Sequence, residues 1–186
     1  AEKAELMLEN VGINPTRTGV IDILKQMGAD ITLLNQRQAG AEPVADILIR
    51  SAPLHGIHIP PDLVPLAIDE FPVLFIAAAA ASGETVLTNA TELRVKESDR
   101  IQVMADGLRI LGVNARPTDD GIVIQGGAMH GGEVDSHGDH RIAMAFAVAG
   151  LHASNTIQIR DCVNVNTSFP GFVELAQSIG LEIQQH

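Results

Sequence analysis

The sequence predicts a mixed α/β (α+β) fold of three repeated αβ units, with the helices packed inside and the sheets outside. Three helical patterns each end on a glycine and continue into a short strand-like segment. Two further helices are apolar on almost every side, and each is followed by a turn and a strand. The 186 residues are 46% hydrophobic and 19% charged, which is typical of a packed globular domain with one core.

The glycine-terminated helices occur three times along the chain. They are expected within residues 21–31, 105–115 and 173–183. Gly28, Gly112 and Gly180 stand where each helix needs a left-handed residue, a conformation that glycine adopts without steric cost. Each is expected to lead into a strand, which predicts three equivalent αβ elements.

The two apolar helices form a second repeat. The first is expected from Phe71 to Ala81 with a strand at 85–87, and the second from residue 140 to Leu151 with a strand at 156–159. An aspartate, Asp69 or Asp139, precedes each helix, where its carboxylate can cap the unpaired backbone N–H groups. Because neither helix has a polar face, both should be buried.

Alternating patterns predict the remaining strands. They are expected at residues 6–11, 45–50 and 121–125. The polar run 164–171 is expected to be a loop that either holds a phosphate or caps the last helix. Together the elements divide into repeat units near 1–58, 59–128 and 129–186, within one domain spanning residues 1–186.

Charge and composition exclude several classes of partner and ligand. Twelve Lys and Arg against 23 Asp and Glu give a net charge of −11, and there is no Trp or Tyr, so we expect no nucleic-acid and no membrane partner. The longest apolar run, 71–81, is about half the roughly 20 residues that span a bilayer. Cys162 stands alone and the histidines lack metal-site spacing, so no metal site is expected. The N-terminus has no leader-like pattern, and with the single cysteine this favours a cytoplasmic location.

The densest charged stretch, residues 92–100, precedes the helix expected from residue 101. Ser98 or Asp99 can cap that helix, and Lys96 and Arg100 beside its positive end would make a local anion site. A solvated turn with paired surface charges explains the same residues equally well. The sequence leaves both readings open.

A second candidate lies at residues 138–141. Arg141 falls in the first turn of a buried helix, so it must face a ligand or a partner such as Asp139. His140 is more often a structural residue than a catalyst in such a place. For Asp69 and Glu70, periodicity alone favours helix capping.

Four motifs resemble those of one enzyme family. Leu93–Arg100 and Gly138–Ala145 resemble the signatures of the 5-enolpyruvylshikimate-3-phosphate synthase family, and Asn10–Gly19 and Ser168–Phe172 match its usual patterns in order. The resemblance implies the enolpyruvyl transferase fold, with two domains of three αβ units each and the active site in the cleft between them. It implies that this chain is the C-terminal domain and that the N-terminal domain is absent.

The resemblance also implies residue roles and a reaction. Asp69 corresponds to a proposed general base at the shikimate hydroxyl, and Glu97 to the residue that moves a proton at the phosphoenolpyruvate methylene. Lys96 corresponds to a contact to shikimate 3-phosphate, and Arg100 and Arg141 to the arginines that bind phosphoenolpyruvate. His140 and Thr167 correspond to two further binding positions of the family. Some members carry a lysine at the position of Thr167, and some carry an asparagine at the position of Glu92.

The implied activity is transfer of the enolpyruvyl group from phosphoenolpyruvate to shikimate 3-phosphate, in the pathway to chorismate and the aromatic amino acids. The family is the target of the herbicide glyphosate. Proton transfer and electrostatics suffice, so no cofactor is expected. Half of the cleft is not in this sequence, so we expect the chain alone to be inactive. The alternatives are a binding or interaction module without catalysis, and a related enolpyruvyl transferase that acts on a UDP-sugar.

Overall fold

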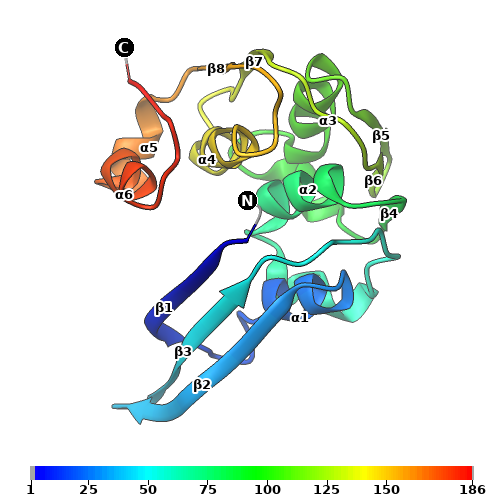
Figure 1. The fold of residues 1–186 in the computed structure, drawn as a ribbon. Coiled ribbons are helices and arrows are strands. Elements are labelled where there is room, and N and C mark those ends of the chain that lie inside the picture. The colour runs from blue at the N-terminus through cyan, green and yellow to red at the C-terminus, as the bar shows by residue number, and fades with distance from the viewer. Residues whose placement is uncertain (1–2, 186) are drawn as a thin grey trace.

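The computed structural model describes residues 3–185, and in it three sheets surround a group of central helices (Figure 1). The strands are β1 (Glu5–Gly12), β2 (Asp30–Ala39), β3 (Glu42–Arg50), β4 (Glu84–Leu87), β5 (Asn114–Thr118), β6 (Gly121–Gln125), β7 (Gly132–Asp135) and β8 (Ile157–Arg160). The helices are α1 (Gly19–Gln26), α2 (Phe71–Ala80), α3 (Arg100–Ile110), α4 (His140–Ala149), α5 (Val163–Ser168) and α6 (Phe172–Ser178). Short 3-10 turns occur at Pro61–Leu63, Pro65–Ala67 and Thr91–Val95. The mixed α/β class is confirmed.

Each sheet is built from neighbouring parts of the chain. The first has the order β1-β3-β2 and the second β4-β6-β5, and both are antiparallel. The third pairs β7 with β8 in parallel. The three sheets therefore draw their strands from residues 5–50, 84–125 and 132–160 respectively.

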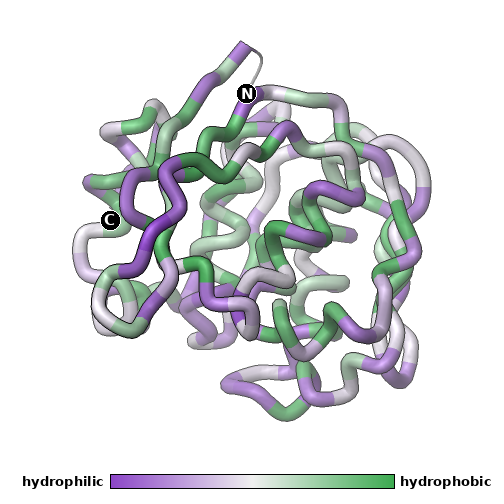
Figure 2. The backbone as a smooth tube through the Cα atoms, turned by 90° about the horizontal axis from the view of Figure 1, so that it is seen from below, coloured by the Kyte–Doolittle hydropathy of each residue, from purple (hydrophilic) through white to green (hydrophobic). Residues whose placement is uncertain are grey.

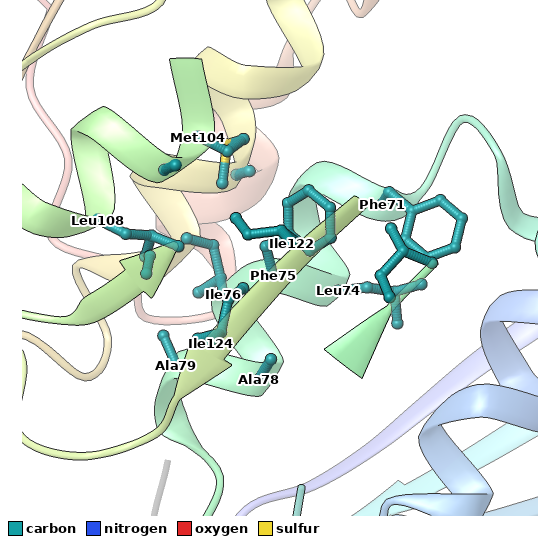
Figure 3. Packing of buried hydrophobic residues seen from close by; sticks show 14 of the residues in the cluster. Phe71, Leu74, Phe75, Ile76, Ala78, Ala79, Met104, Leu108, Ile122 and Ile124 are labelled. Atoms are coloured by element: carbon teal, nitrogen blue, oxygen red, sulfur yellow. The ribbon is translucent and has the colours of Figure 1, made fainter. Parts of the chain in front are cut away.

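The helix α2 lies at the centre of the core. It contacts α1, α3 and α4, and seven of its ten residues are buried. Figure 3 shows Phe71 and Phe75 of α2 beside Ile122 and Ile124 of β6, with Met104 and Leu108 of α3 nearby. Viewed from below, many of the outermost loops are hydrophilic (Figure 2). The expectation of a buried, apolar helix here is confirmed.

The three glycine helix ends form as expected, but only two of the strands do. Gly28, Gly112 and Gly180 have φ values of +97°, +84° and +95°. The first two lead into β2 and β5, whereas residues 181–185 form no strand, and that prediction is wrong. The three helix ends close alike, since the amides of Ala29, Val113 and Leu181 donate to the carbonyls of Leu24, Leu108 and Ala176. The difference lies beyond them, because residues 181–185 pair with no strand of the described structure.

The expected loop at 164–171 is also wrong in its first half, which forms α5. Asn and Thr are weak helix formers, which is why the composition indicated a loop. Val165 is buried in the described structure, and its carbonyl accepts the amide of Phe169. Burial of this one apolar residue outweighs the local preference of its polar neighbours.

No helix within residues 3–185 is long and apolar enough to cross a membrane.

Gly107 fixes how closely α3 approaches α4. A Cβ atom at this position would lie 2.2 Å from Cζ of Phe146, which is fully buried. Gly107→Ala is expected to lower the free energy of unfolding by about 1–3 kcal/mol, because the packed ring has no room to move. Urea unfolding measures the change. Gly127→Ala is the control, since a Cβ there meets nothing within 4 Å; equal stability of the two variants would contradict the packing argument.

Candidate active site

The N-terminal ends of α2, α3 and α4 meet at one cluster of charged side chains. Asp69 lies just before α2, Arg100 opens α3, and Arg141 is the second residue of α4. Ion pairs join all three. Three helix starts directed at one place add positive partial charge to that of the arginines, which favours an anion there.

Asp69 is the centre of this cluster. Its Oδ1 lies 3.7 Å from Nη1 of Arg100, and its Oδ2 lies 3.6 Å from Nη2 of Arg141 and 3.4 Å from Nη1 of Arg17. The expectation that Asp69 and Glu70 cap α2 is wrong, because no side chain caps that helix. Pro72 in the first turn needs no hydrogen-bond acceptor, so the Asp69 carboxylate is left to pair with the arginines.

Arg100 is the largest fully buried side chain in the described structure, with 1% of its surface exposed. Its Nε donates to Oδ2 of Asp139 at 2.8 Å, and its Nη2 donates to Oε2 of Glu97 at 2.6 Å. Its Nη1 is buried and has no hydrogen-bond partner among the described residues. A buried N–H without an acceptor is costly, and an oxygen of a bound anion would satisfy it.

Asp139 caps α4 as expected. Its Oδ1 accepts the amides of Arg141 and Ile142, and its Oδ2 accepts from Arg100 and from the Ser98 hydroxyl. Burial pushes the pKa of this carboxyl up, but the hydrogen bond and charge of Arg100, with the Arg141 amide and Ser98, hold the pKa below its usual value.

The Arg141 side chain pairs elsewhere than with Asp139. Its guanidinium faces Asp69 and Glu70 and donates to the Asp69 carbonyl at 3.0 Å, while only its backbone amide bonds to Asp139. The structure therefore gives the Arg141 side chain charged partners, as the sequence allows, but they are Asp69 and Glu70 rather than Asp139. The guanidinium of Arg141 is thus directed at Asp69, the residue at the centre of the cluster.

Lys96 lines a hollow together with Asp69 and Glu70. The hollow has a volume of about 260 Å³ and is lined by Thr16, Arg17, Pro65, Leu66, Ile68, Asp69, Glu70 and Lys96. The Lys96 ammonium is paired with the carboxylate of Glu92, and about a fifth of the lysine side chain is exposed. Two cations, Arg17 and Lys96, therefore line the hollow, and Arg100 and Arg141 reach Asp69 from outside its lining. Each of the four is paired with a carboxylate.

Of the remaining candidate residues, His140 lies next to the charged cluster and Thr167 lies on a helix outside the hollow. His140 is the first residue of α4, next to Arg141, and is half-buried. Thr167 is exposed on α5, a helix that contacts α4 but contributes no residue to the hollow. Asp99 caps α3, as one of the two expected residues. The described residues contain no group of three or more His, Cys, Asp or Glu that could hold a metal.

Residues 1–175 match the family model described as EPSP synthase (3-phosphoshikimate 1-carboxyvinyltransferase). The chain belongs to the EPSP synthase family. Among its relatives, the 3-phosphoshikimate 1-carboxyvinyltransferase of Nitrosococcus oceani is 67% identical over 181 residues, and that of Legionella pneumophila is 60% identical over 183. These alignments cover 97% and 98% of this chain and 41% and 42% of the relatives, so the chain spans less than half of their length.

Solved structures agree with the EPSP synthase assignment. The structure of an EPSP synthase from Acinetobacter baumannii superposes with a TM-score of 0.96 at 61% sequence identity. The match covers 99% of this chain and 44% of that structure's chain. The enolpyruvyl transferase NikO from Streptomyces tendae has a TM-score of 0.73 at 20% identity, and it shares the fold.

Sequence reasoning missed two members of this EPSP synthase cluster. The sequence pattern predicts a capping role for Glu70, and it contains Arg17 only as part of a family-like motif. No local pattern reveals that Arg17 meets Asp69, because 52 residues separate them and the contact depends on the packing of α1 against the segment before α2. The position of Arg17 within a motif of the family was the one available signal.

Proposed function

We propose that this chain supplies one half of the active site of an EPSP synthase, which transfers the enolpyruvyl group of phosphoenolpyruvate to the 5-hydroxyl of shikimate 3-phosphate and releases phosphate. The convergence of Asp69, Arg100 and Arg141 at three helix starts carries the proposal. Membership of the family and the names of the relatives support the reaction.

The charged cluster suits ligands that carry phosphate and carboxylate groups. Arg100 and Arg141 are proposed to bind phosphoenolpyruvate, and Nη1 of Arg100, which makes no hydrogen bond to the described residues, offers one donor. Lys96 is proposed to bind shikimate 3-phosphate from the other side of the hollow. His140 and Thr167 are proposed as additional contacts at the edge.

Asp69 and Glu97 are proposed to move the protons. The hydroxyl oxygen bonds to C2 of phosphoenolpyruvate as Asp69 takes the hydroxyl proton, and the methylene carbon gains a proton from Glu97. Breakage of the bond between C2 and the phosphate oxygen then releases phosphate, and the methyl carbon returns a proton to Glu97, which restores the carbon–carbon double bond. Every step is a proton transfer or a carbon–oxygen bond change, so the proposed chemistry needs no cofactor.

The other half of the cleft is proposed to come from the part of the full-length enzyme outside this chain. On the family resemblance, this chain is the C-terminal domain and the missing part is the N-terminal domain. Closure of the two domains would exclude water and complete the site. The setting proposed for this reaction is the cytoplasm.

A turnover assay tests the proposal. Phosphate release from phosphoenolpyruvate and shikimate 3-phosphate is measured with this chain alone, and again after the chain replaces the matching segment of the Nitrosococcus oceani relative. Activity only in the joined protein is the expected result. Turnover by the chain alone would contradict the half-site proposal, and an inactive but folded joined protein would favour a binding module.

Glu92 is expected to weaken substrate binding, because its carboxylate competes with the substrate for Lys96. In the joined enzyme, Glu92→Gln should lower KM for shikimate 3-phosphate by about two- to five-fold, which is the size of an exposed ion pair. Added salt should reduce the difference. Glu174→Gln, on exposed α6, is the matched control; an unchanged or raised KM for Glu92→Gln would show that Glu92 does not compete.

A further inference from the structure

The turn before α1 contains a family-like motif for which the proposed reaction gives no role. Within it, the side-chain oxygen of Asn14 accepts the amide and the hydroxyl of Thr16, at 3.1 and 2.9 Å. The Asn14 carbonyl accepts the amide of Arg17 at 2.8 Å. These bonds fix the backbone that carries the Arg17 side chain.

The same turn is fixed against the segment that leads to Asp69. Gly19 packs so closely on Leu66 that a Cβ at Gly19 would lie 2.7 Å from the Leu66 carbonyl carbon. Leu66 belongs to the 3-10 turn Pro65–Ala67, two residues before Asp69 begins the approach to α2. The start of α1, which follows the turn directly, therefore packs on the segment that precedes Asp69.

Arg17 approaches Asp69 from the side of the hollow. Its Nη1 lies 3.4 Å from Oδ2 of Asp69, and the arginine side chain is 70% exposed whereas that of Asp69 is 25% exposed. Arg100 and Arg141 face the same carboxylate from α3 and α4, where Arg100 is buried and Arg141 is half-buried. Asp69 is thus held by cations from three elements, of which only Arg17 stands on the open side.

We infer that Arg17 is a positioning residue that holds the Asp69 carboxylate in the orientation needed to receive the substrate proton. The inference rests on the proposed function, which makes Asp69 the base. A displacement of about 1 Å in a reacting group can cost on the order of 100-fold in rate, so a weak surface ion pair can matter for turnover without mattering for stability.

The joined enzyme tests this role through the separation of kcat from KM. Arg17→Ala should lower kcat by about 10- to 100-fold and change KM for each substrate by less than about three-fold. Arg17→Lys, which keeps the charge, should recover part of kcat. Arg50→Ala removes a comparable exposed pair, with Glu5 at 2.8 Å, and is the control expected to leave kcat unchanged. A raised KM for one substrate with unchanged kcat would make Arg17 a substrate contact, and no change at all would make it a surface charge; either overturns the inference.

A second measurement separates this inference from the proposed function. Guanidinium ¹⁵N NMR on the chain itself should show restricted rotation for Arg17, and Asp69→Asn should release it while Glu174→Gln, at an exposed carboxylate on α6, should not. Free rotation in the unsubstituted chain overturns the positioning role even where the joined enzyme is active. An inactive joined enzyme with restricted Arg17 contradicts the proposed reaction instead.

Discussion

Asp139→Asn is expected to lower the free energy of unfolding by about 3–5 kcal/mol, because it leaves the buried guanidinium of Arg100 without its buried counter-charge. Asn is nearly the same size as Asp and keeps an oxygen that can cap α4, so the loss comes mainly from the charge. Glu97 also pairs with Arg100, but its side chain is 53% exposed and cannot replace a fully buried partner. Denaturant unfolding at neutral pH measures the difference.

Acid should erase most of this difference. The pKa of Asp139 in the folded protein is below its usual value of 3.8, so the unfolded chain binds its proton first as pH falls. The stabilising contribution is complete above about pH 4 to 5 and is lost as pH falls through the folded-state pKa. The unfolding free energies of the wild type and Asp139→Asn should therefore begin to approach each other as pH falls below about 4 and should meet only below the folded-state pKa of Asp139.

Asp119→Asn provides the matched control, since Asp119 is exposed in the turn between β5 and β6. It should change stability by less than about 0.5 kcal/mol. A parallel pH dependence for wild type and Asp139→Asn would show that the buried pair is not what titrates.

Local rules predicted the elements of this fold better than its charged contacts. Gly28 and Gly112 end helices for a reason contained in their own backbone, and α2 is buried because it has no polar face. The strand after Gly180 failed because a strand also needs a neighbour, which no pattern within the segment can supply. The sequence pattern was sufficient to predict the elements that depend on periodicity within one segment. It was not sufficient for a strand, which depends on pairing with another segment.

The charged cluster illustrates the same limit. Asp69 and Asp139 occupy similar positions before similar helices, yet only Asp139 caps its helix. Three arginines from distant parts of the chain hold Asp69 instead, and their meeting depends on the packing of helices rather than on the sequence around Asp69. The resemblance to the EPSP synthase family singled out Asp69, Arg100 and Arg141 together, whereas residue patterns alone left each with a structural explanation.

Glu97→Gln in the joined enzyme should lower kcat by about 100- to 10,000-fold, the range that a positioned proton donor contributes. The glutamine keeps the size of the side chain and an oxygen that can accept from Nη2 of Arg100, so binding of phosphoenolpyruvate should change little. Glutamine cannot supply the proton that the methylene carbon must gain. Steady-state kinetics should therefore show the loss in kcat rather than in KM.

Two comparisons make this result specific to Glu97. Glu133→Gln removes another glutamate that pairs with an arginine, Arg160 at 2.7 Å, but on the β7–β8 sheet away from the hollow, and it should leave kcat unchanged. Unfolding of Glu97→Gln should lie within about 1 kcal/mol of wild type, because its half-exposed ion pair contributes little stability. If Glu97→Gln retained most of its turnover, the proton would have to come from another group, and Glu97 would be a partner that orients Arg100. If it lost stability in step with activity, the defect would lie in the Arg100 cluster rather than in catalysis.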